Sequence, residues 1–125
     1  MNITRVFEAL EYQAKNYPRE DVLASKIDGK WVTYSTQEYL RIANNISYGL
    51  LELGMKKGDK IITASNNRPE WNFMDFGMMQ IGVVHVPIYP TLSVEETKFI
   101  LEHCEATLAV VSDAKIYKKF TEARE

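Results

Sequence analysis

Apolar positions in the second half of the chain recur in short runs that alternate with segments of helical length. Residues 60–65 are rich in β-branched side chains, residues 67–81 are nearly uncharged, and residues 83–88 form another apolar run. This pattern predicts a strand, a helix and a strand. Because a crossover of this length joins two apolar strands, we expect the strands to be parallel neighbours.

The alternation continues towards the carboxyl terminus. Ser93 and Glu96 have the spacing of a helix-capping box, residues 107–112 form a third apolar strand, and Asp113 is placed to cap a polar terminal helix. Strands that alternate with helices in this way are typical of a parallel sheet.

Two amphipathic helices are predicted in the first half of the chain. Apolar side chains recur on one helical face over residues 3–17, and Pro18 ends that helix. Ser35 and Glu38 form another capping-box pattern, and Gly54 ends the long helix that follows them. The apolar stripe of this long helix is expected to consist of Tyr39, Ile42, Ala43, Ile46, Leu50 and Leu53.

Between these two helices, extended runs flank Asp28-Gly29. A two-residue link of this type is a strong hairpin signal, so residues 22–34 are predicted to form a peripheral antiparallel β-hairpin. Together the patterns predict an α/β fold with a parallel-sheet core, helices on both faces, the hairpin and an amino-terminal helix. A length of 125 residues suits one domain over residues 1–125.

The helix predicted over residues 67–81 begins with Asn67, whose side chain is expected to accept from unpaired N–H groups, with Glu70 at the third helical position. Most of its other side chains are large and apolar, and Trp71 is expected to be buried. Such a helix is more often packed core than the wall of an acyl-binding pocket. We therefore interpret it as core.

Ligands of open α/β sheets gather beyond the carboxyl ends of the strands. Asn66-Asn67, Tyr89-Pro90-Thr91 and Ser112-Asp113 follow the three predicted strands. The candidate pocket-edge residues are accordingly Asn66, Asn67, Tyr89 and Thr91. For Tyr89 and Thr91 the alternative is ordinary turn structure.

Other chemical signals have simpler explanations. His85 lies within an apolar strand that is expected to be buried, where a hydrogen-bonded strand histidine is expected before a base or a ligand. His103 and Cys104 are adjacent on a helix and diverge by about 100°, so they do not chelate one metal. Gly77 and Gly82 have phosphate-loop spacing, but Val83-Val84 stand where Lys and Ser or Thr are required. No metal, cofactor-binding or catalytic residue is assigned.

Composition describes a folded, mixed-charge chain. Hydrophobic residues make up 46% and charged residues 26%, with a net charge of −2. The basic residues form no stripe, so no nucleic-acid partner is expected. No apolar run is long enough for a membrane span, and no secretory signal is expected. The one cysteine permits no internal disulfide, which fits a cytoplasmic location.

Three motifs follow one another in the order used by adenylate-forming enzymes. They are "GDKI" at residues 58–61, "NNRPEW" at 66–71 and "IGVVHVPIYPT" at 81–91. Upstream, "WVTYSTQEYL" at 31–40 and "ISYGLLELGMKKGDK" at 46–60 extend the likeness over nearly the whole chain. The chain resembles the acyl-CoA synthetases of this superfamily, and its long-chain fatty-acid branch in particular.

This resemblance implies a two-step reaction in the parent protein. A fatty-acid carboxylate attacks the α-phosphate of Mg-ATP, and coenzyme A then displaces AMP from the acyl-adenylate. The implied substrates and cofactors are the fatty acid, ATP, Mg²⁺ and coenzyme A. The family's phosphate loop, ribose-binding Asp and catalytic Lys have no counterpart here, so we expect an amino-terminal portion that is inactive alone. The parent is expected in the cytoplasm, with peripheral association at a membrane as the alternative.

Two other classes of function remain as alternatives. A small flavodoxin-like or receiver-like binding module has the same architecture, but the acidic strand end of a receiver and the Ser/Thr-rich loop of a flavodoxin are both lacking. A non-catalytic assembly surface is the second alternative, because apolar faces of such a domain could pair in a homodimer.

Overall fold

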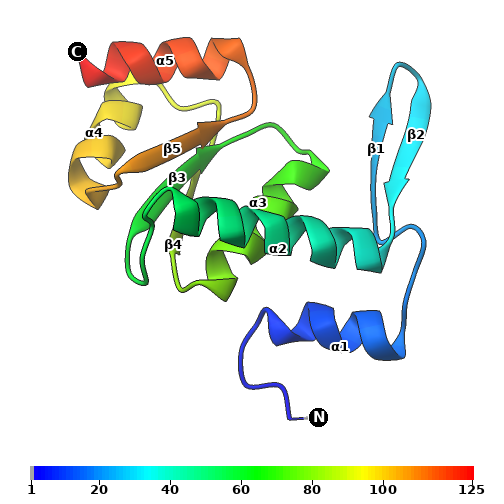
Figure 1. The fold of residues 1–125 in the computed structure, drawn as a ribbon. Helices are drawn as coiled ribbons and strands as arrows, with labels where there is room; N and C mark the ends of the chain where they lie inside the picture. The colour runs from blue at the N-terminus through cyan, green and yellow to red at the C-terminus, as the bar shows by residue number, and fades with distance from the viewer. Residues whose placement is uncertain (1) are drawn as a thin grey trace. The chain divides into compact units, whose positions relative to one another are not determined.

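A computed structural model describes residues 2–125 of the chain. Figure 1 shows helices and strands that alternate along most of it. In chain order the elements are α1 (Glu8–Asn16), β1 (Leu23–Ile27), β2 (Lys30–Tyr34), α2 (Thr36–Glu52), β3 (Lys60–Ala64), α3 (Pro69–Gln80), β4 (Val84–Ile88), α4 (Val94–Cys104), β5 (Leu108–Val111) and α5 (Ala114–Arg124).

The contacts of the described residues group into two compact units. One unit contains residues 2–55 and Arg68–Ile81, and therefore α1, the hairpin, α2 and α3. The other contains Lys56–Asn67 and Gly82–Glu125, and therefore the parallel strands with α4 and α5. The expectation of one domain over residues 1–125 stays a prediction.

The hairpin of the first unit has the predicted two-residue turn. Strands β1 and β2 pair antiparallel, with Ile27 opposite Lys30. Asp28 and Gly29 link them with φ values of 50° and 79°. Positive φ at both positions defines a type I′ turn, whose twist matches that of the strands it joins.

Helix α2 begins and ends as its sequence predicts. Ser35 accepts from the backbone N–H of Glu38, and Glu38 accepts from the N–H of Ser35, which completes a capping box. At the other end Gly54 has φ 83°, and the N–H of Met55 donates to the carbonyl of Leu50. This is a Schellman ending, which uses the left-handed conformation that glycine adopts readily.

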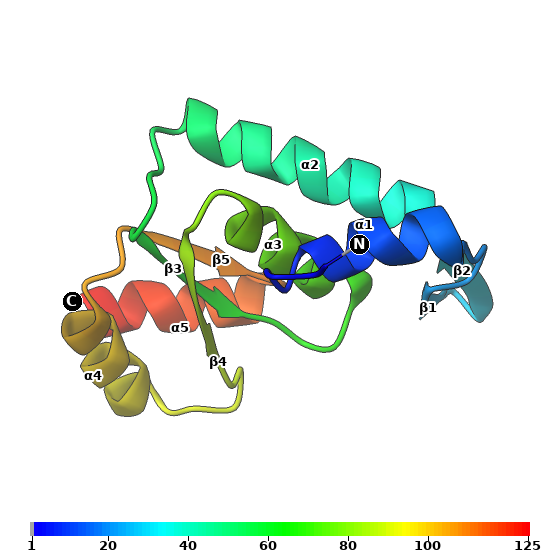
Figure 2. The same ribbon diagram turned by 90° about the horizontal axis from the view of Figure 1, so that it is seen from below.

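Helix α2 packs against both α1 and α3 within this unit (Figure 2). Leu10, Tyr39 and Phe73 form the buried centre of the contact. The Tyr39 ring meets Phe73 and Phe76 edge-on, at centroid distances of 5.5 and 5.2 Å. Edge-to-face packing of this kind adds about 0.5–1.5 kcal/mol per pair beyond apolar burial.

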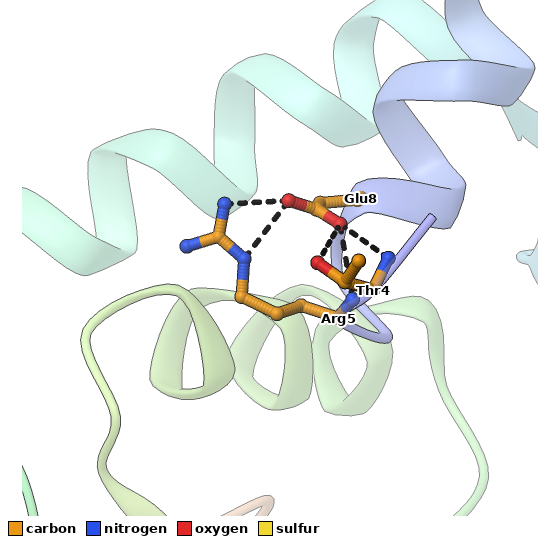
Figure 3. Close-up of polar contacts among 3 residues, drawn as sticks. All are labelled: Thr4, Arg5 and Glu8. Carbon is orange, nitrogen blue, oxygen red and sulfur yellow. Dashed lines mark hydrogen bonds and ion pairs between the residues drawn. The ribbon is translucent and has the colours of Figure 1, made fainter. Parts of the chain in front are cut away.

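The start of α1 is organised by a carboxylate (Figure 3). Glu8 Oε2 accepts from the backbone N–H groups of Thr4 and Arg5, at 2.8 and 3.0 Å, and the Arg5 guanidinium pairs with Oε1. These N–H groups precede the helix and have no partner within it. Residues 3–7 therefore lead into the helix rather than belonging to it, and α1 is shorter than predicted.

The second unit is built on a parallel three-stranded sheet with strand order β4-β3-β5. Ile61 pairs with both His85 and Leu108 across the sheet. The central strand β3 is almost completely buried from Ile61 to Ala64. The predicted parallel pairing is confirmed.

Helices α4 and α5 pack together and cover one face of this sheet (Figure 1). Ile62 and Ala64 of β3 pack there against Ile116 and Phe120 of α5. Ser93 closes a capping box with Glu96 at the start of α4, and Asp113 accepts from the N–H of Ile116 at the start of α5. Both predicted helix starts are thus confirmed.

Several predictions about element ends and burial were wrong. Strand β4 lies at an edge of this sheet and leaves Val84 and Pro87 exposed, whereas the sequence predicted a buried strand. An edge position suits Pro87, which has no N–H to donate. Leu53 is 70% exposed because it is the C-cap of α2 rather than part of its apolar stripe.

The predicted cap of α3 is also wrong. Arg68 is the N-cap and makes no side-chain capping bond, and Pro69 occupies the first turn. Proline suits this position because its missing N–H would have no helical partner. The Glu70 carboxylate pairs with Arg68 instead of with the backbone of Asn67. Trp71, predicted to be buried, is half-buried.

The α/β class, the parallel sheet, the hairpin and the amino-terminal helix agree with the predicted fold class. The sheet's face beside α4 and α5 is covered as expected. Helical cover on its other face stays a prediction.

Candidate functional site

The carboxyl ends of β3 and β5 bring three polar side chains together. The backbone N–H of Asn66 donates to Ser112 Oγ at 3.2 Å, and its Nδ2 atom donates to Asp113 Oδ2 at 3.0 Å. Ser112 Oγ also donates to Asp113 Oδ2 at 3.2 Å. The strands are parallel neighbours, so their carboxyl ends meet at one edge and the contacts are a direct result of the register.

Asp113 connects this cluster to α5. Its Oδ1 atom accepts from the backbone N–H of Ile116 at 2.9 Å. That hydrogen bond, followed by the Ser112 hydroxyl and further contacts, lowers the pKa of the Asp113 carboxyl below its ordinary value. The carboxylate is therefore charged at neutral pH, and it orders both a helix start and the Asn66 side chain.

The turn after β4 is held from α5. Tyr89 accepts from the N–H of Leu92, which closes a turn with Pro90 at its second position. The Lys119 ammonium donates to the carbonyl oxygens of Pro90 and Leu92, at 2.7 and 2.6 Å. The backbone of the turn faces Lys119, while Tyr89 and Thr91 are exposed, Tyr89 to 78%.

The predicted pocket-edge residues thus occupy two places at the end of the sheet. Asn66 joins Ser112 and Asp113 in one hydrogen-bonded cluster. Tyr89 and Thr91 lie on the turn that Lys119 holds. Asn67 is exposed beside Asn66. A role for any of these four residues in a pocket stays a prediction.

Sequence reasoning missed Lys119. It lies in a polar terminal helix beside another lysine, and neither its spacing nor its neighbours signal a role. Its partners are two backbone carbonyls, which are present whatever the side chains at those positions and therefore leave no signal in the sequence. Only the packing of α5 beside the turn reveals the contact.

A polar pair also crosses from β3 to β4. Thr63 Oγ1 lies 2.6 Å from His85 Nε2, and Thr63 is buried. His85 is a hydrogen-bonded strand residue, as predicted, although it is half-buried. The pair satisfies polar atoms that lie among the apolar side chains of the sheet.

An open groove of about 740 Å³ runs beside β5, between α4 and α5. Apolar side chains such as Leu101 and Phe120 line it, and its charged lining residues are Lys98, Glu102, Arg124 and Glu125. Because both signs of charge are present, the groove does not select one class of ionic ligand. No pattern in the sequence predicted this groove.

Within residues 2–125, no group of three or more His, Cys, Asp or Glu side chains is placed to hold a metal ion. The Asp113 oxygens already accept from Asn66, Ser112 and Ile116. Asn66, Ser112 and Asp113 therefore do not fit a Mg²⁺ site. None of the helices in the same residue range is long and apolar enough to cross a membrane.

Comparison with known proteins identifies relatives whose names differ in substrate, from long-chain-fatty-acid–CoA ligases to crotonobetaine/carnitine–CoA ligases. The long-chain-fatty-acid–CoA ligase FadD15 of Mycobacterium bovis is 35% identical over 82 residues, which are 66% of this chain and 14% of that protein. The long-chain-fatty-acid–CoA ligase ACSBG1 of Rattus norvegicus is 31% identical over 113 residues, which are 90% of this chain and 15% of that protein. The chain therefore matches a small part of each relative.

Solved structures agree with the fold. The anthranilate CoA ligase AuaEII, in complex with anthranoyl-AMP, superposes with a TM-score of 0.81 over 96% of this chain and 22% of that chain, at 21% identity. At this identity the likeness shows the fold alone. The sequence profile of the family described as "AMP-binding enzyme" matches residues 10–125. The family resemblance of the sequence is thereby confirmed, and this chain belongs to the AMP-binding enzyme family.

Proposed function

We propose that this chain is the amino-terminal part of an ATP-dependent long-chain fatty-acid CoA ligase. The match of the AMP-binding family over residues 10–125 carries the proposal. The names of the relatives from Mycobacterium bovis and Rattus norvegicus support the long-chain fatty acid as substrate. The motif order from residue 58 to residue 91 supports the same branch.

In the proposed reaction, the fatty acid and ATP form an acyl-adenylate and pyrophosphate, and coenzyme A then takes the acyl group with release of AMP. The phosphate loop and the catalytic lysine belong, on this proposal, to other parts of the protein. The residues of this chain contribute scaffold and the edge of a pocket. The turn that carries Tyr89 and Thr91 suits that role, because it lies at the carboxyl end of a parallel strand.

We place the whole protein in the cytoplasm, and the presence of a single cysteine in this chain supports that location. In the alternative of a non-catalytic assembly surface, the apolar surfaces of two copies of the protein would pair to form a homodimer. Size-exclusion chromatography with light scattering would distinguish a monomer from a dimer.

Fatty-acid-dependent exchange of pyrophosphate into ATP tests the proposed function. The whole protein should catalyse exchange with palmitate, and the isolated chain should stay at the blank. Among residues 2–125 no group of three or more His, Cys, Asp or Glu side chains is placed to hold Mg²⁺, and charge stabilisation of this kind is central to phosphoryl chemistry. Exchange by the isolated chain would contradict the proposal that the catalytic residues lie in other parts of the protein. Absence of exchange by the whole protein would contradict the proposed ligase activity.

A further inference from the structure

Lys119 is placed differently from the other lysines of α5. Its Nζ atom makes two short hydrogen bonds to the carbonyl oxygens of Pro90 and Leu92, and its side chain is half-buried. The neighbouring Lys118 is exposed and lies 3.8 Å from Glu122 of its own helix. One lysine thus links α5 to the turn after β4, and the other makes a contact within α5.

The turn depends on this link because it has few internal bonds. Pro90 has no N–H, and the Leu92 N–H donates to the Tyr89 carbonyl at a long 3.3 Å. A lysine ammonium has three donors, of which the two carbonyls use two. Hydrogen bonds from a charged donor are roughly twice as strong as neutral ones, so the ammonium is the strongest restraint on the turn.

The same charge reaches the start of α4. Glu96 closes the capping box with Ser93, and these hydrogen bonds lower the pKa of its carboxyl, with a smaller contribution from Lys119. Lys119 therefore links the turn to α5 by hydrogen bonds, and its charge also acts on the carboxylate at the start of α4. The Tyr89 side chain, on the outer side of the turn, is left exposed.

We propose that Lys119 is a positioning residue that fixes the turn of residues 89–92, so that Tyr89 and Thr91 meet the acyl substrate in a set geometry. The part of this inference that concerns the substrate rests on the proposed ligase activity. The part that says that Lys119 restrains the turn does not depend on it. Lys119 acts through the backbone carbonyls of the turn and makes no contact with the reacting atoms.

The test compares Lys119→Met with Lys118→Met in the whole protein. Both changes remove one positive charge from α5 and keep a long unbranched side chain, but only the first removes the hydrogen bonds to Pro90 and Leu92. Lys119→Arg restores a charged donor. The measurements are amide hydrogen exchange of the Leu92 N–H and steady-state kinetics with palmitate.

Lys119→Met should speed exchange of the Leu92 amide about tenfold, because the restraint on the local opening of the turn is lost. It should also raise the KM for palmitate about tenfold while kcat changes less than twofold, because a loosened turn misplaces the substrate. Lys119→Arg should recover most of both effects, and Lys118→Met should behave as the wild type. A merely structural role would lower the amount of active enzyme and leave KM unchanged.

Leu92 exchange that is the same in Lys119→Met and Lys118→Met would overturn the inference, whatever the activity of the protein. Faster exchange with an unchanged KM would overturn the link to the substrate. A wild-type protein that forms no acyl-CoA would contradict the proposed function. In that case the exchange data still decide whether Lys119 fixes the turn.

Discussion

Gly77 of α3 lies so close to Ile46 of α2 that a Cβ atom at Gly77 would be 2.5 Å from Ile46 Cγ2. The Gly77 carbonyl also accepts a hydrogen bond of 2.7 Å from the Ser47 hydroxyl. At this point the backbone of α3 therefore packs directly against a side chain of α2. The glycine spacing that resembled a phosphate loop has a packing explanation in Gly77.

Replacement of Gly77 by alanine should destabilise the protein. The added methyl group would overlap Ile46 and approach the Ala43 carbonyl, at 3.1 Å, so the helices must separate. Overpacking of this kind costs about 1–3 kcal/mol in free energy of unfolding. Urea denaturation followed by circular dichroism would measure the loss.

Gly49→Ala is the matched control for Gly77→Ala. Gly49 lies inside α2, and a Cβ placed there would have no described atom within 4 Å apart from its chain neighbours and the backbone of its own helix. Alanine has the higher helix propensity, so this change should stabilise the protein by about 0.5–1 kcal/mol. Equal effects of the two substitutions would contradict close packing at Gly77.

Local signals in the sequence were sufficient to predict most of the elements. The capping boxes at Ser35 and Ser93 depend on residues three positions apart, and the type I′ turn depends on Asp28-Gly29 alone. Such signals depend only on residues that are close together in the sequence. The parallel pairing also followed, because a helix-length crossover leaves few other topologies.

Features that depend on distant neighbours were not predictable. Hydrophobicity alone does not tell an edge strand from a central one, so β4 was expected to be buried. At the candidate site, the Asn66–Asp113 contact joins residues 47 positions apart; the sequence predicted only that both residues follow strand ends, not that they contact each other. Lys119 binds backbone atoms of another element and left no pattern in the sequence.

The hairpin turn should require glycine or asparagine at position 29. Gly29 has φ 79°, a conformation that costs other residues about 1–2 kcal/mol. Gly29→Ala should therefore lower the free energy of unfolding by about 1 kcal/mol, whereas Gly29→Asn should lose less because asparagine tolerates this region. Thermal unfolding of both variants shows which of them loses more stability. A smaller loss of stability in Gly29→Ala than in Gly29→Asn would contradict the type I′ turn.

Acid should weaken the start of α1 through Glu8. Hydrogen bonds from the Thr4 backbone and then the Arg5 side chain lower the pKa of Glu8 from 4.5 to about 2. A lowered pKa in the folded state stabilises the protein above pH 4.5. This contribution is lost as the pH falls from 4.5 through about 2, because the unfolded chain binds a proton first.

Glu8→Gln should therefore flatten the pH dependence of the urea midpoint between pH 5 and pH 2 relative to the wild type, by removing this carboxylate. Glu11→Gln removes another carboxylate of the same helix and leaves the Thr4 and Arg5 contacts in place. It serves as the control. A Glu8→Gln profile that parallels the wild type would show that these contacts do not stabilise the fold.

Tyr89→Ala and Thr91→Val in the whole protein should lower kcat/KM for a long-chain fatty acid about tenfold or more, with little loss of stability, because both side chains are exposed. Tyr117→Ala removes another exposed tyrosine, from α5, and should leave the kinetics unchanged. Equal losses of activity and stability would assign Tyr89 and Thr91 to turn structure alone.

Mass-spectrometric detection of the acyl thioester formed by the whole protein tests the central claim most directly. With palmitate, ATP, Mg²⁺ and coenzyme A, we expect palmitoyl-CoA, with one AMP and one pyrophosphate released per thioester. The product should disappear when either ATP or coenzyme A is left out. An acyl-adenylate that accumulates without thioester in the presence of coenzyme A, or thioester formation confined to short or aromatic acids, would contradict a long-chain fatty-acid CoA ligase.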